Sequence, residues 1–461
     1  MEAVGPYHLP GLQPQAFADA TFGEPPQEAC LRLPVVTEAL LQEAATGIVA
    51  ARDAYLADLP VDRVVDVIDD AAGRWLDPSY HLRRKAVETL PAVTGYSPAM
   101  LERGLPETMR PFRRDGLLDL LRSELGDPSV LDGAGRPSGP RLTTIVLAGN
   151  VPAVAVESLV HALLLKSACL LKASSRDPVF PALFAQSLAE VDPELAATVA
   201  VAWWKGGTAD LDRAALAGAD AVIAYGGSEA IDALRGLAPS SARFVDYGPR
   251  ISFAAVGRDA LARGKLDRLT AGAALDVSLF DQQGCVAPHA IYVERGGETA
   301  PLEFARALAG AMRDFERSYP RGRLTAEEAA RIQQLRGAWQ MRQAAGQGVA
   351  LFESKGSTAW TVAYDEAAFE LRPSCLNRVV TVVPVDDLAR LPEAVARMGP
   401  LLQSLGLATS QDRVRSLAPA LARAGVTRLC PIGRMQFPPA TWRHDGRHNL
   451  LPLLRWLDVE G

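Results

Sequence analysis

Apolar residues recur at helical spacing in the N-terminal part of the chain. Between residues 36 and 125 they return every three or four positions, the period of an amphipathic helix. The pattern is clearest in VTEALLQEAATGIVAARDAYL, VDRVVDVIDDAAGRWL and GLLDLLRSEL. Prolines that would end a helix stand at Pro60, Pro78 and Pro106. We therefore predict a helical region with breaks at these prolines.

From residue 141 short apolar runs alternate with stretches of helical spacing. The predicted strands are RLTTIVLAG, ACLLKAS, TVAVAWW and ADAVIAYGGS, and the predicted helices are VESLVHALLLKSA, PVFPALFAQSLAEV and EAIDALRGL. This alternation is typical of βαβ units that build a parallel sheet with both faces covered. Ligands of such sheets bind at the carboxyl ends of the strands. Residues 126–140, rich in turn formers, are predicted to be a connection or a short hairpin.

A second unit is predicted after residue 256. It contains expected helices at 257–275 and 298–317 and expected strands at HAIYVE, RVVTVVPV and VTRLCPI. The charged stretch 313–346 indicates a solvated helical pair. The predicted domains are accordingly 1–256, 257–425 and a C-terminal extension, 426–461.

Charge and targeting signals exclude several classes of protein. The 461 residues include 48 basic and 54 acidic side chains, so no excess of positive charge favours nucleic acid. The N-terminus shows no secretion signal, and the apolar segment 153–171 carries Glu157, His161 and Lys166, which indicates a buried helix, not a membrane span. Five cysteines without a CxxC pair fit reduced thiols, and we expect a cytoplasmic protein.

Phosphate and metal motifs are weak in this sequence. No GxxxxGK[ST] occurs, and Gly133 and Gly135 run into Pro137, which indicates a turn. The pairs Glu157/His161 and His444/His448 lack the further ligands that a zinc site needs, so no metal is expected.

One thiol stands apart from the other four. Cys169 and Cys430 lie in apolar strand-like runs and are predicted to be inert, while Cys30 and Cys375 lie near proline in sequence predicted to be irregular. Cys285 follows a polar run and a glycine and precedes a strand, where a loop can expose its sulfur. A buried or incidental cysteine is the alternative for Cys285.

Ordered motifs resemble those of a known family. They are LAGNVPA (147–153), LKASSRDP (171–178), ADAVIAYGGSEA (219–230), FVDYGPRISFAAV (244–256) and FDQQGCVAPHAIYVE (280–294). In order and spacing they resemble the aldehyde dehydrogenase superfamily, and most closely its LuxC-like acyl-CoA reductases, which supply fatty aldehyde in bacterial bioluminescence. MQFPPATWRHDGRHNLLPLLRW (435–456) is similar to the C-terminal signature of that branch. The resemblance implies an α/β fold with a Rossmann-like nucleotide-binding domain and a catalytic thiol domain.

The resemblance also implies the catalytic residues. Cys285 matches the nucleophile, which would form a thioester with the acyl group. Asn150 matches the side chain that stabilises the oxyanion. From the residues alone, a structural role for Asn150 in the turn before Pro152 is the favoured interpretation. Asp246 matches the position of the base of hydrolytic relatives, but a reductase that exchanges thiols needs no activated water, so we expect a structural or auxiliary role for Asp246.

Cofactor residues follow from the same motifs. Lys172 matches a ribose-binding lysine, and Gly227 and Ser228 match the start of the helix over the pyrophosphate. At the Ser174–Arg176 turn, Ser175 stands where NAD-preferring relatives have glutamate, and Arg176 offers a cationic partner for a 2'-phosphate. These differences favour NADPH. The alternative is that Arg176 is only a surface charge.

The resulting hypothesis is an NADPH-dependent acyl-CoA reductase that forms aldehyde, with a fatty acyl-CoA or an acyl-carrier thioester as substrate. Its alternatives are an NAD(P)-dependent aldehyde dehydrogenase with Asp246 as base, or a non-catalytic subunit of an acyl-processing complex. The resemblance implies a homo-oligomer and partners such as an acyl-activating synthetase or an acyl transferase. Trp442, His444 and Asp445 receive no role from the sequence.

Overall fold

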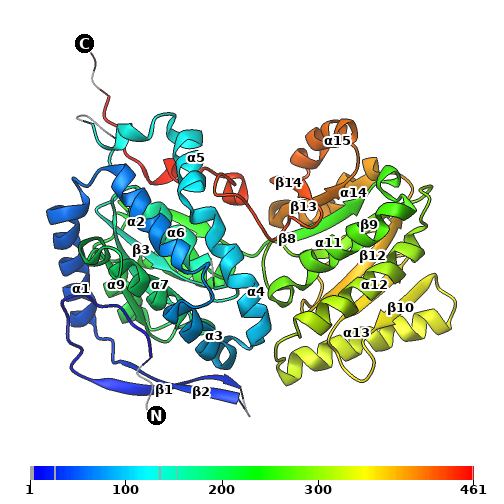
Figure 1. Cartoon of the computed structure of the whole chain (residues 1–461), viewed down its shortest axis with the longest axis horizontal. Coiled ribbons are helices and arrows are strands. Elements are labelled where there is room, and N and C mark those ends of the chain that lie inside the picture. The colour runs from blue at the N-terminus through cyan, green and yellow to red at the C-terminus, as the bar shows by residue number, and fades with distance from the viewer. Residues whose placement is uncertain (1–4, 25–26, 134–136, 153, 459, 461) are drawn as a thin grey trace. The chain divides into compact units, whose positions relative to one another are not determined.

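The computed structural model describes residues 5–24, 27–133, 137–152, 154–458 and 460. It divides into two compact units (Figure 1). The first comprises Met1–Gly95, Leu105–Gly248 and Pro439–Gly461, and the second Tyr96–Gly104 and Pro249–Pro438. Gly135 of the predicted turn and Ala153 of the predicted apolar segment lie outside the described residues.

The first unit is built on a five-stranded parallel sheet in the order β5-β4-β3-β6-β7. Its strands are β3 (Leu142–Val146), β4 (Ala168–Ala173), β5 (Val199–Trp203), β6 (Ala221–Tyr225) and β7 (Arg243–Tyr247). Every residue of β3, β4 and β6 is buried, because helices cover both faces. The apolar runs of these strands are therefore continuous, as predicted.

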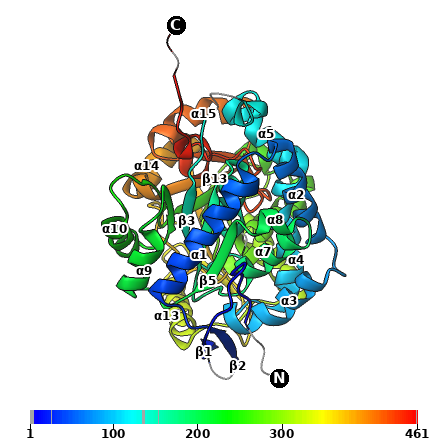
Figure 2. The ribbon, with the colours of Figure 1, turned by 90° about the vertical axis from the view of Figure 1, so that its left-hand side faces the viewer.

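Helices surround this sheet in layers. They are α1 (Glu38–Ala51), α2 (Val61–Arg74), α3 (His81–Thr94), α4 (Pro98–Met109), α5 (Arg114–Leu125), α6 (Val154–Leu164), α7 (Phe180–Ala189), α8 (Pro193–Ala196), α9 (Ala209–Leu216) and α10 (Ser228–Leu237), and residues of α4 belong to both units. Figure 2 shows α1 lying across the strands of the sheet, where Leu41 and Ile48 pack on Leu170. A hairpin of β1 (Phe17–Glu24) and β2 (Gln27–Pro34) precedes α1.

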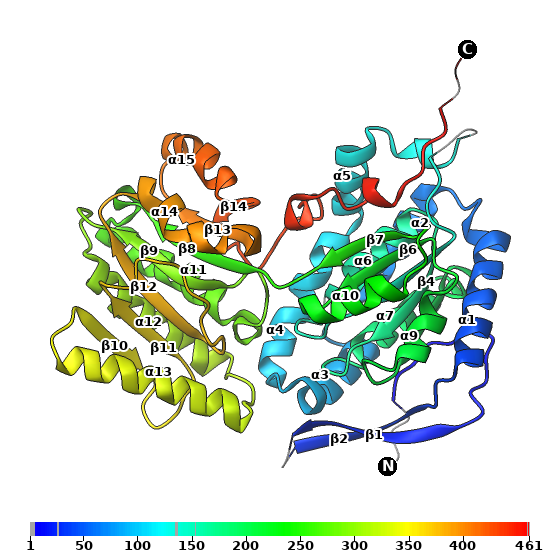
Figure 3. The same ribbon diagram turned by 180° about the vertical axis from the view of Figure 1, so that it is seen from behind.

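The second unit contains a seven-stranded sheet in the order β10-β11-β12-β9-β8-β13-β14, parallel except for β10. Its strands are β8 (Ile251–Val256), β9 (Pro288–Glu294), β10 (Val349–Glu353), β11 (Thr361–Asp365), β12 (Val379–Val385), β13 (Leu402–Ala408) and β14 (Arg428–Pro431). Its helices are α11 (Leu266–Ser278), α12 (Pro301–Ser318), α13 (Ala326–Ala344), α14 (Leu391–Val395) and α15 (Gln411–Arg423). The helices α11 and α12 cover one face, and α14 and α15 the other (Figure 3).

Short helical turns connect these elements. They are η1 (Arg52–Leu56), η2 (Arg110–Phe112), η3 (Pro128–Leu131), η4 (Arg258–Ala260), η5 (Arg263–Lys265), η6 (Leu279–Gln282), η7 (Leu388–Arg390), η8 (Ala396–Leu401), η9 (His444–Gly446) and η10 (Leu451–Leu453). No helix in the described part of the chain is long and apolar enough to cross a membrane.

Local predictions fail at three points. The helix expected at 257–275 begins only at Leu266, because the short turns η4 and η5 occupy the first part of that range. Pro106 does not end a helix but lies inside α4, where Leu105 and Met109 are fully buried. Burial of such side chains contributes about 1.5–3 kcal/mol each, which offsets the cost of about 3 kcal/mol for an internal proline. Cys30 lies in β2, paired with Thr21, and not in irregular sequence. The breaks at Pro60 and Pro78 are confirmed.

The compact units divide the chain differently from the predicted ranges 1–256, 257–425 and 426–461. The strand β8 pairs with β9 and β13, so its hydrogen bonds place it in the second sheet. The chain after Pro438 belongs to the first unit. As folding units the predicted ranges stay a prediction.

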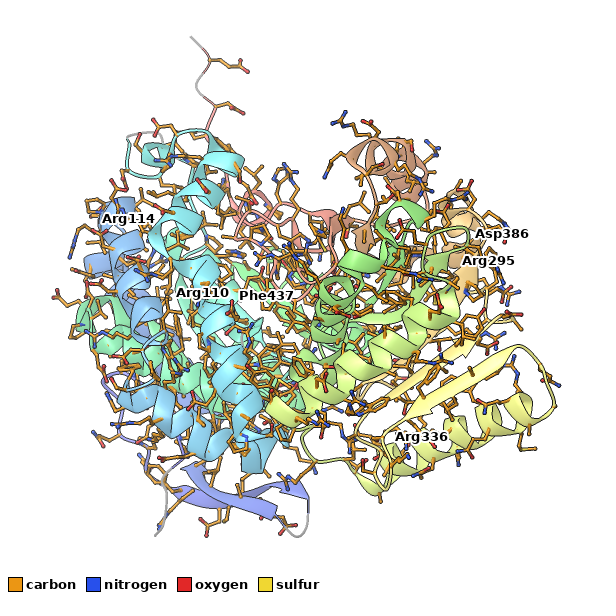
Figure 4. The ribbon with its side chains drawn as sticks, turned by 45° about the vertical axis from the view of Figure 1, so that its right-hand side comes forward. Arg110, Arg114, Arg295, Arg336, Asp386 and Phe437 are labelled. Atoms are coloured by element: carbon orange, nitrogen blue, oxygen red, sulfur yellow. The ribbon has the colours of Figure 1, made fainter. Side chains whose placement is uncertain are left out.

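A buried carboxylate fixes the end of β9. Glu294 is fully buried and accepts hydrogen bonds from Arg413 at 2.7 Å and from the Arg258 side chain at 3.0 Å. Burial opposes its ionisation, but the hydrogen bonds from Arg413 and Arg258 outweigh burial and lower the pKa of Glu294 to about 2. Figure 4 shows the neighbouring Arg295 and Asp386 side by side, 3.4 Å apart.

We expect Glu294→Gln to lower the free energy of unfolding by about 2–3 kcal/mol at pH 7, because it removes the buried carboxylate charge that Arg258 and Arg413 share. The pKa of folded Glu294 lies below its usual 4.5, so this contribution is complete above about pH 4.5 and is lost as the pH falls towards 2. Denaturant unfolding at several pH values measures it. The control Glu393→Gln removes an exposed pair with Arg390 and should cost under about 0.5 kcal/mol. Equal losses for both variants would contradict the account.

Candidate active site

The predicted cofactor residues gather at one edge of the first sheet. Parallel pairing brings the carboxyl ends of β3, β4 and β6 together. Asn150 follows β3, the Ser174–Arg176 turn follows β4, and Gly227 and Ser228 follow β6. Lys172 lies on β4, opposite Val146 of β3. This edge is where ligands of parallel sheets bind.

Lys172 is held in a largely buried position at this edge. Its side chain is 8% exposed, and Nζ lies 5.4 Å from the centre of the Trp204 ring. Burial lowers the pKa of Lys172, and the nearby carboxylate of Asp212 opposes that shift. The Trp204 ring is itself fixed, because its Nε1 donates to Asp212 at 2.8 Å. The ammonium group therefore has a defined position.

The turn after β4 presents Ser175 and Arg176 to solvent. Arg176 donates its backbone N–H to Ser174 Oγ at 3.1 Å, and Ser175 Oγ accepts from Trp203 Nε1 at 3.3 Å. Gly149 packs so closely on this turn that a Cβ would lie 2.5 Å from the Asp177 nitrogen. The turn and the segment containing Asn150 are thus in direct contact.

The helix α10 begins at the same edge. Gly227 is its N-cap residue and Ser228 its first residue, and both are exposed. The free N–H groups of a helix N-terminus favour an anion such as a phosphate. Gly227 and Ser228 therefore have the position that a pyrophosphate-binding role requires.

Asp246 is engaged by arginines. Its Oδ1 accepts from Arg235 at 2.8 Å, and its backbone oxygen accepts from Arg447. These two contacts tie Asp246 to α10 and to the C-terminal segment. The geometry supports the structural role that the sequence analysis favours.

Cys285 lies in the second unit, at the amino end of β9. Its backbone oxygen accepts from Ser252 Oγ at 2.7 Å, and Ser252 Oγ accepts from Ser404 N at 3.1 Å. The adjacent strands β8 and β13 thereby fix the main chain at Cys285. The residue is partly exposed.

A strained turn precedes Cys285. Phe280, Asp281 and Gln282 have φ of 48°, 52° and 67°, a region that costs non-glycine residues about 1–2 kcal/mol each. A buried ion pair between Asp281 and Arg378, 2.7 Å long, stabilises this turn.

Further hydrogen bonds close the same turn against β12. The Gln282 side chain donates to Val379 O at 3.1 Å and accepts from Val379 N at 2.9 Å. The backbone N–H of Asn377 donates to the backbone oxygen of Asp281 at 3.1 Å. The approach of the chain to Cys285 is therefore fixed on two sides.

Burial affects three of the other thiols. Burial raises the pKa of Cys169 and of Cys375, and raises the pKa of Cys430 to about 11. Cys169 is fully buried in β4, as predicted for an inert residue. Cys375 lies outside regular secondary structure, also as predicted.

Sequence reasoning missed several pairings. Asp281 was seen only as part of a polar run, and Arg378 was not considered, because their contact joins positions 97 residues apart. Glu157 and His444 were each considered as metal ligands with other partners, yet they pair with each other. Within the described ranges, no group of three or more His, Cys, Asp or Glu side chains is arranged to hold a metal ion.

Comparison with known proteins gives consistent results. A profile of the acyl-CoA reductase (LuxC) family matches residues 56–456. The long-chain acyl-protein thioester reductase of Vibrio harveyi is 26% identical over 419 residues, which span 88% of this chain and 84% of that protein. A protein of the same name from Photorhabdus luminescens is 30% identical over 249 residues, 51% of this chain and 50% of its own.

Solved structures show the fold. Indole-3-acetaldehyde dehydrogenase of P. syringae, in complex with NAD+, gives a TM-score of 0.74 at 15% identity and covers 100% of this chain and 97% of its own. An NAD-dependent benzaldehyde dehydrogenase from Corynebacterium glutamicum gives 0.69 at 15% identity, with coverage of 99% and 98%. The predicted aldehyde dehydrogenase-like fold is confirmed.

We expect iodoacetamide at neutral pH to modify Cys285 well before Cys169, Cys375 and Cys430, because burial disfavours the thiolate of those three residues. Peptide mapping by mass spectrometry gives the order of modification. Cys30, which is exposed, is the internal control for access alone. Faster modification of Cys375 or Cys430 than of Cys285 would contradict the assignment.

Proposed function

The chain belongs to the acyl-CoA reductase (LuxC) family, and from that premise we propose that it reduces a long-chain acyl thioester to the aldehyde through a thioester on Cys285, with NADPH as the reductant. Membership of the family supports an oxidoreductase that reduces thioesters. The identities of the nucleophile, the nucleotide and the acyl donor are our proposals.

One observation carries the proposal. Asn150, Lys172, the Ser174–Arg176 turn and the start of α10 all lie at the carboxyl edge of one parallel sheet. A non-catalytic scaffold protein would not need these residues at one edge of a sheet. The same chain holds a partly exposed cysteine shortly after a turn that a buried ion pair stabilises.

The residues present fit a nicotinamide nucleotide. The N-terminus of α10 suits a pyrophosphate, and the ammonium of Lys172 suits a ribose hydroxyl. A bound nicotinamide nucleotide would supply the hydride. The exposed Ser175 and Arg176 present a hydroxyl and a guanidinium in place of a carboxylate, which supports a preference for a 2'-phosphate.

The chemistry assigned to Cys285 has two stages. Its thiolate attacks the carbonyl carbon, a new S–C bond forms, and the bond to the donor sulfur breaks, so that the donor thiol leaves and takes a proton from solvent. Asn150 would donate its side-chain N–H to the oxyanion. After reduction of the enzyme thioester, the S–C bond to Cys285 breaks, which releases aldehyde and restores the thiolate.

The acyl donor is a CoA or a carrier-protein thioester. Both offer the same thioester bond. The relatives from Vibrio harveyi and Photorhabdus luminescens are named for acyl-protein thioesters. The two donors are separated by measuring aldehyde from palmitoyl-CoA and from a palmitoylated carrier protein. An aldehyde dehydrogenase that releases acid would require Asp246 as a base, and the ion pair with Arg235 argues against it. Partner proteins and self-association stay predictions.

We expect Cys285→Ala to abolish aldehyde formation while NADPH binding stays within about twofold, because the sulfur forms the covalent bond and does not hold the nucleotide. Aldehyde trapping and NADPH fluorescence measure the two properties. Cys30→Ala, which changes an exposed thiol in β2, serves as the control. Retained aldehyde formation in Cys285→Ala would exclude the proposed nucleophile.

For Arg176→Ala we expect the KM for NADPH to rise about tenfold or more and the KM for NADH to stay unchanged, because a charge-assisted hydrogen bond to the 2'-phosphate is lost. Steady-state kinetics with both nucleotides measures the ratio. Arg213→Ala removes an exposed arginine of α9 paired with Asp210 and should leave the ratio unchanged. Equal effects of Arg176→Ala on the KM values for both nucleotides would show that Arg176 does not bind the 2'-phosphate of NADPH.

A further inference from the structure

The C-terminal segment, residues 439–458, packs on the first unit through a carboxylate of α5. Glu124 accepts the backbone N–H groups of Asn449 at 2.7 Å, Leu450 at 2.8 Å and Leu451 at 3.1 Å. This contact fixes the later part of the segment. It does not involve the preceding residues, which include His444.

His444 makes a second, separate contact with the first turn of α6. Its Nδ1 lies 3.2 Å from Glu157 Oε2, and its side chain is 7% exposed. Burial raises the pKa of Glu157, but the charges of His444 and His161 outweigh burial and lower it below its usual value. An ionised carboxylate can only accept hydrogen bonds. His444 Nδ1 therefore carries a proton and donates a hydrogen bond to Glu157 Oε2.

Two aromatic rings pack against the imidazole of His444. The ring centres of Tyr247 and Trp442 lie 4.3 Å and 4.5 Å from that of His444. Tyr247 stacks in turn on Tyr225 at 4.6 Å, and these two tyrosines end β7 and β6. Through Tyr247, the imidazole of His444 therefore packs against the end of the sheet.

The first turn of α6 lies close in sequence to Asn150. The helix begins at Val154, so Asn150 lies in the short connection between β3 and α6. On the β3 side, Gly149 is packed against Arg176 and Asp177. On the helix side, Glu157 is tied to His444. Asn150 thus lies in sequence between two residues with contacts to other elements, Gly149 and Glu157.

We propose that His444 is a positioning residue for Asn150. Through Glu157 it fixes the first turn of α6, and that turn sets the direction in which the connection presents the Asn150 amide. This inference rests on the proposed function of Asn150 as the oxyanion donor. It assigns a role to a residue of the C-terminal segment that touches neither the acyl group nor the nucleotide in the proposed reaction.

The kinetic test is a double-mutant cycle in the full-length protein with palmitoyl-CoA and NADPH. We expect Asn150→Ala to lower kcat about 100–1000-fold and His444→Ala to lower it about 10–100-fold, with little change in the KM for NADPH. The double variant should be no slower than Asn150→Ala alone, because the positioning no longer matters. His444→Asn keeps a donor near the Nδ1 position and should restore kcat to within about threefold.

A second readout does not depend on activity. Hydrogen exchange of the peptide amides in 147–158 should rise at least about tenfold in His444→Ala and stay near wild type in His444→Asn. Glu124→Gln is the matched control, since it weakens the same segment at its other contact and should leave exchange in 147–158 and kcat unchanged. If His444→Ala fails to fold, Glu157→Leu provides the same comparison from the other partner of the pair.

The outcomes separate the two claims. Multiplicative losses in the double variant, or unchanged exchange in 147–158, would overturn the positioning role alone. Full activity of Asn150→Ala would overturn both the oxyanion role of Asn150 and this inference. Absence of aldehyde with any thioester would overturn the proposed function, while the exchange measurement would still decide whether His444 fixes the connection.

Discussion

Parallel pairing of β3, β4 and β6 is the constraint on which the candidate site depends. Because parallel strands end at the same edge, segments separated by up to 78 residues, such as the connection at Asn150 and the start of α10, follow strands that end side by side. The close contact of Gly149 with the Arg176–Asp177 turn follows from this arrangement. The chemistry of the edge then depends on which side chains the loops carry.

The second unit positions its candidate nucleophile, Cys285, in a different way. Cys285 precedes β9 and so lies at the amino edge of its sheet, where the rule for ligands of parallel sheets gives no guidance. There the position of the main chain depends on side chains: the Asp281–Arg378 ion pair, the Gln282 amide and the hydroxyl of Ser252. Three consecutive residues with positive φ are tolerated because these contacts stabilise them.

The sequence predicts what local pattern determines and misses what distant pairing determines. The strands β3, β4, β5 and β6 are fully or almost fully buried and read as apolar runs, whereas β10 is half-buried at a sheet edge and β13 buries the polar residues Gln403 and Ser404, so neither was recognised. The order of the motifs led to the proposed roles of Cys285 and Asn150. No pattern could join Glu157 to His444, which are 287 residues apart.

The central claim is that Cys285 carries the acyl group before reduction. Incubation of the protein with palmitoyl-CoA in the absence of nucleotide, followed by mass spectrometry of its peptides, tests this directly. The account predicts a palmitoyl thioester on the peptide containing Cys285, which disappears with release of aldehyde when NADPH is added. Acylation of another residue, or aldehyde formation in the same protein without any acylated Cys285 peptide, would contradict the account.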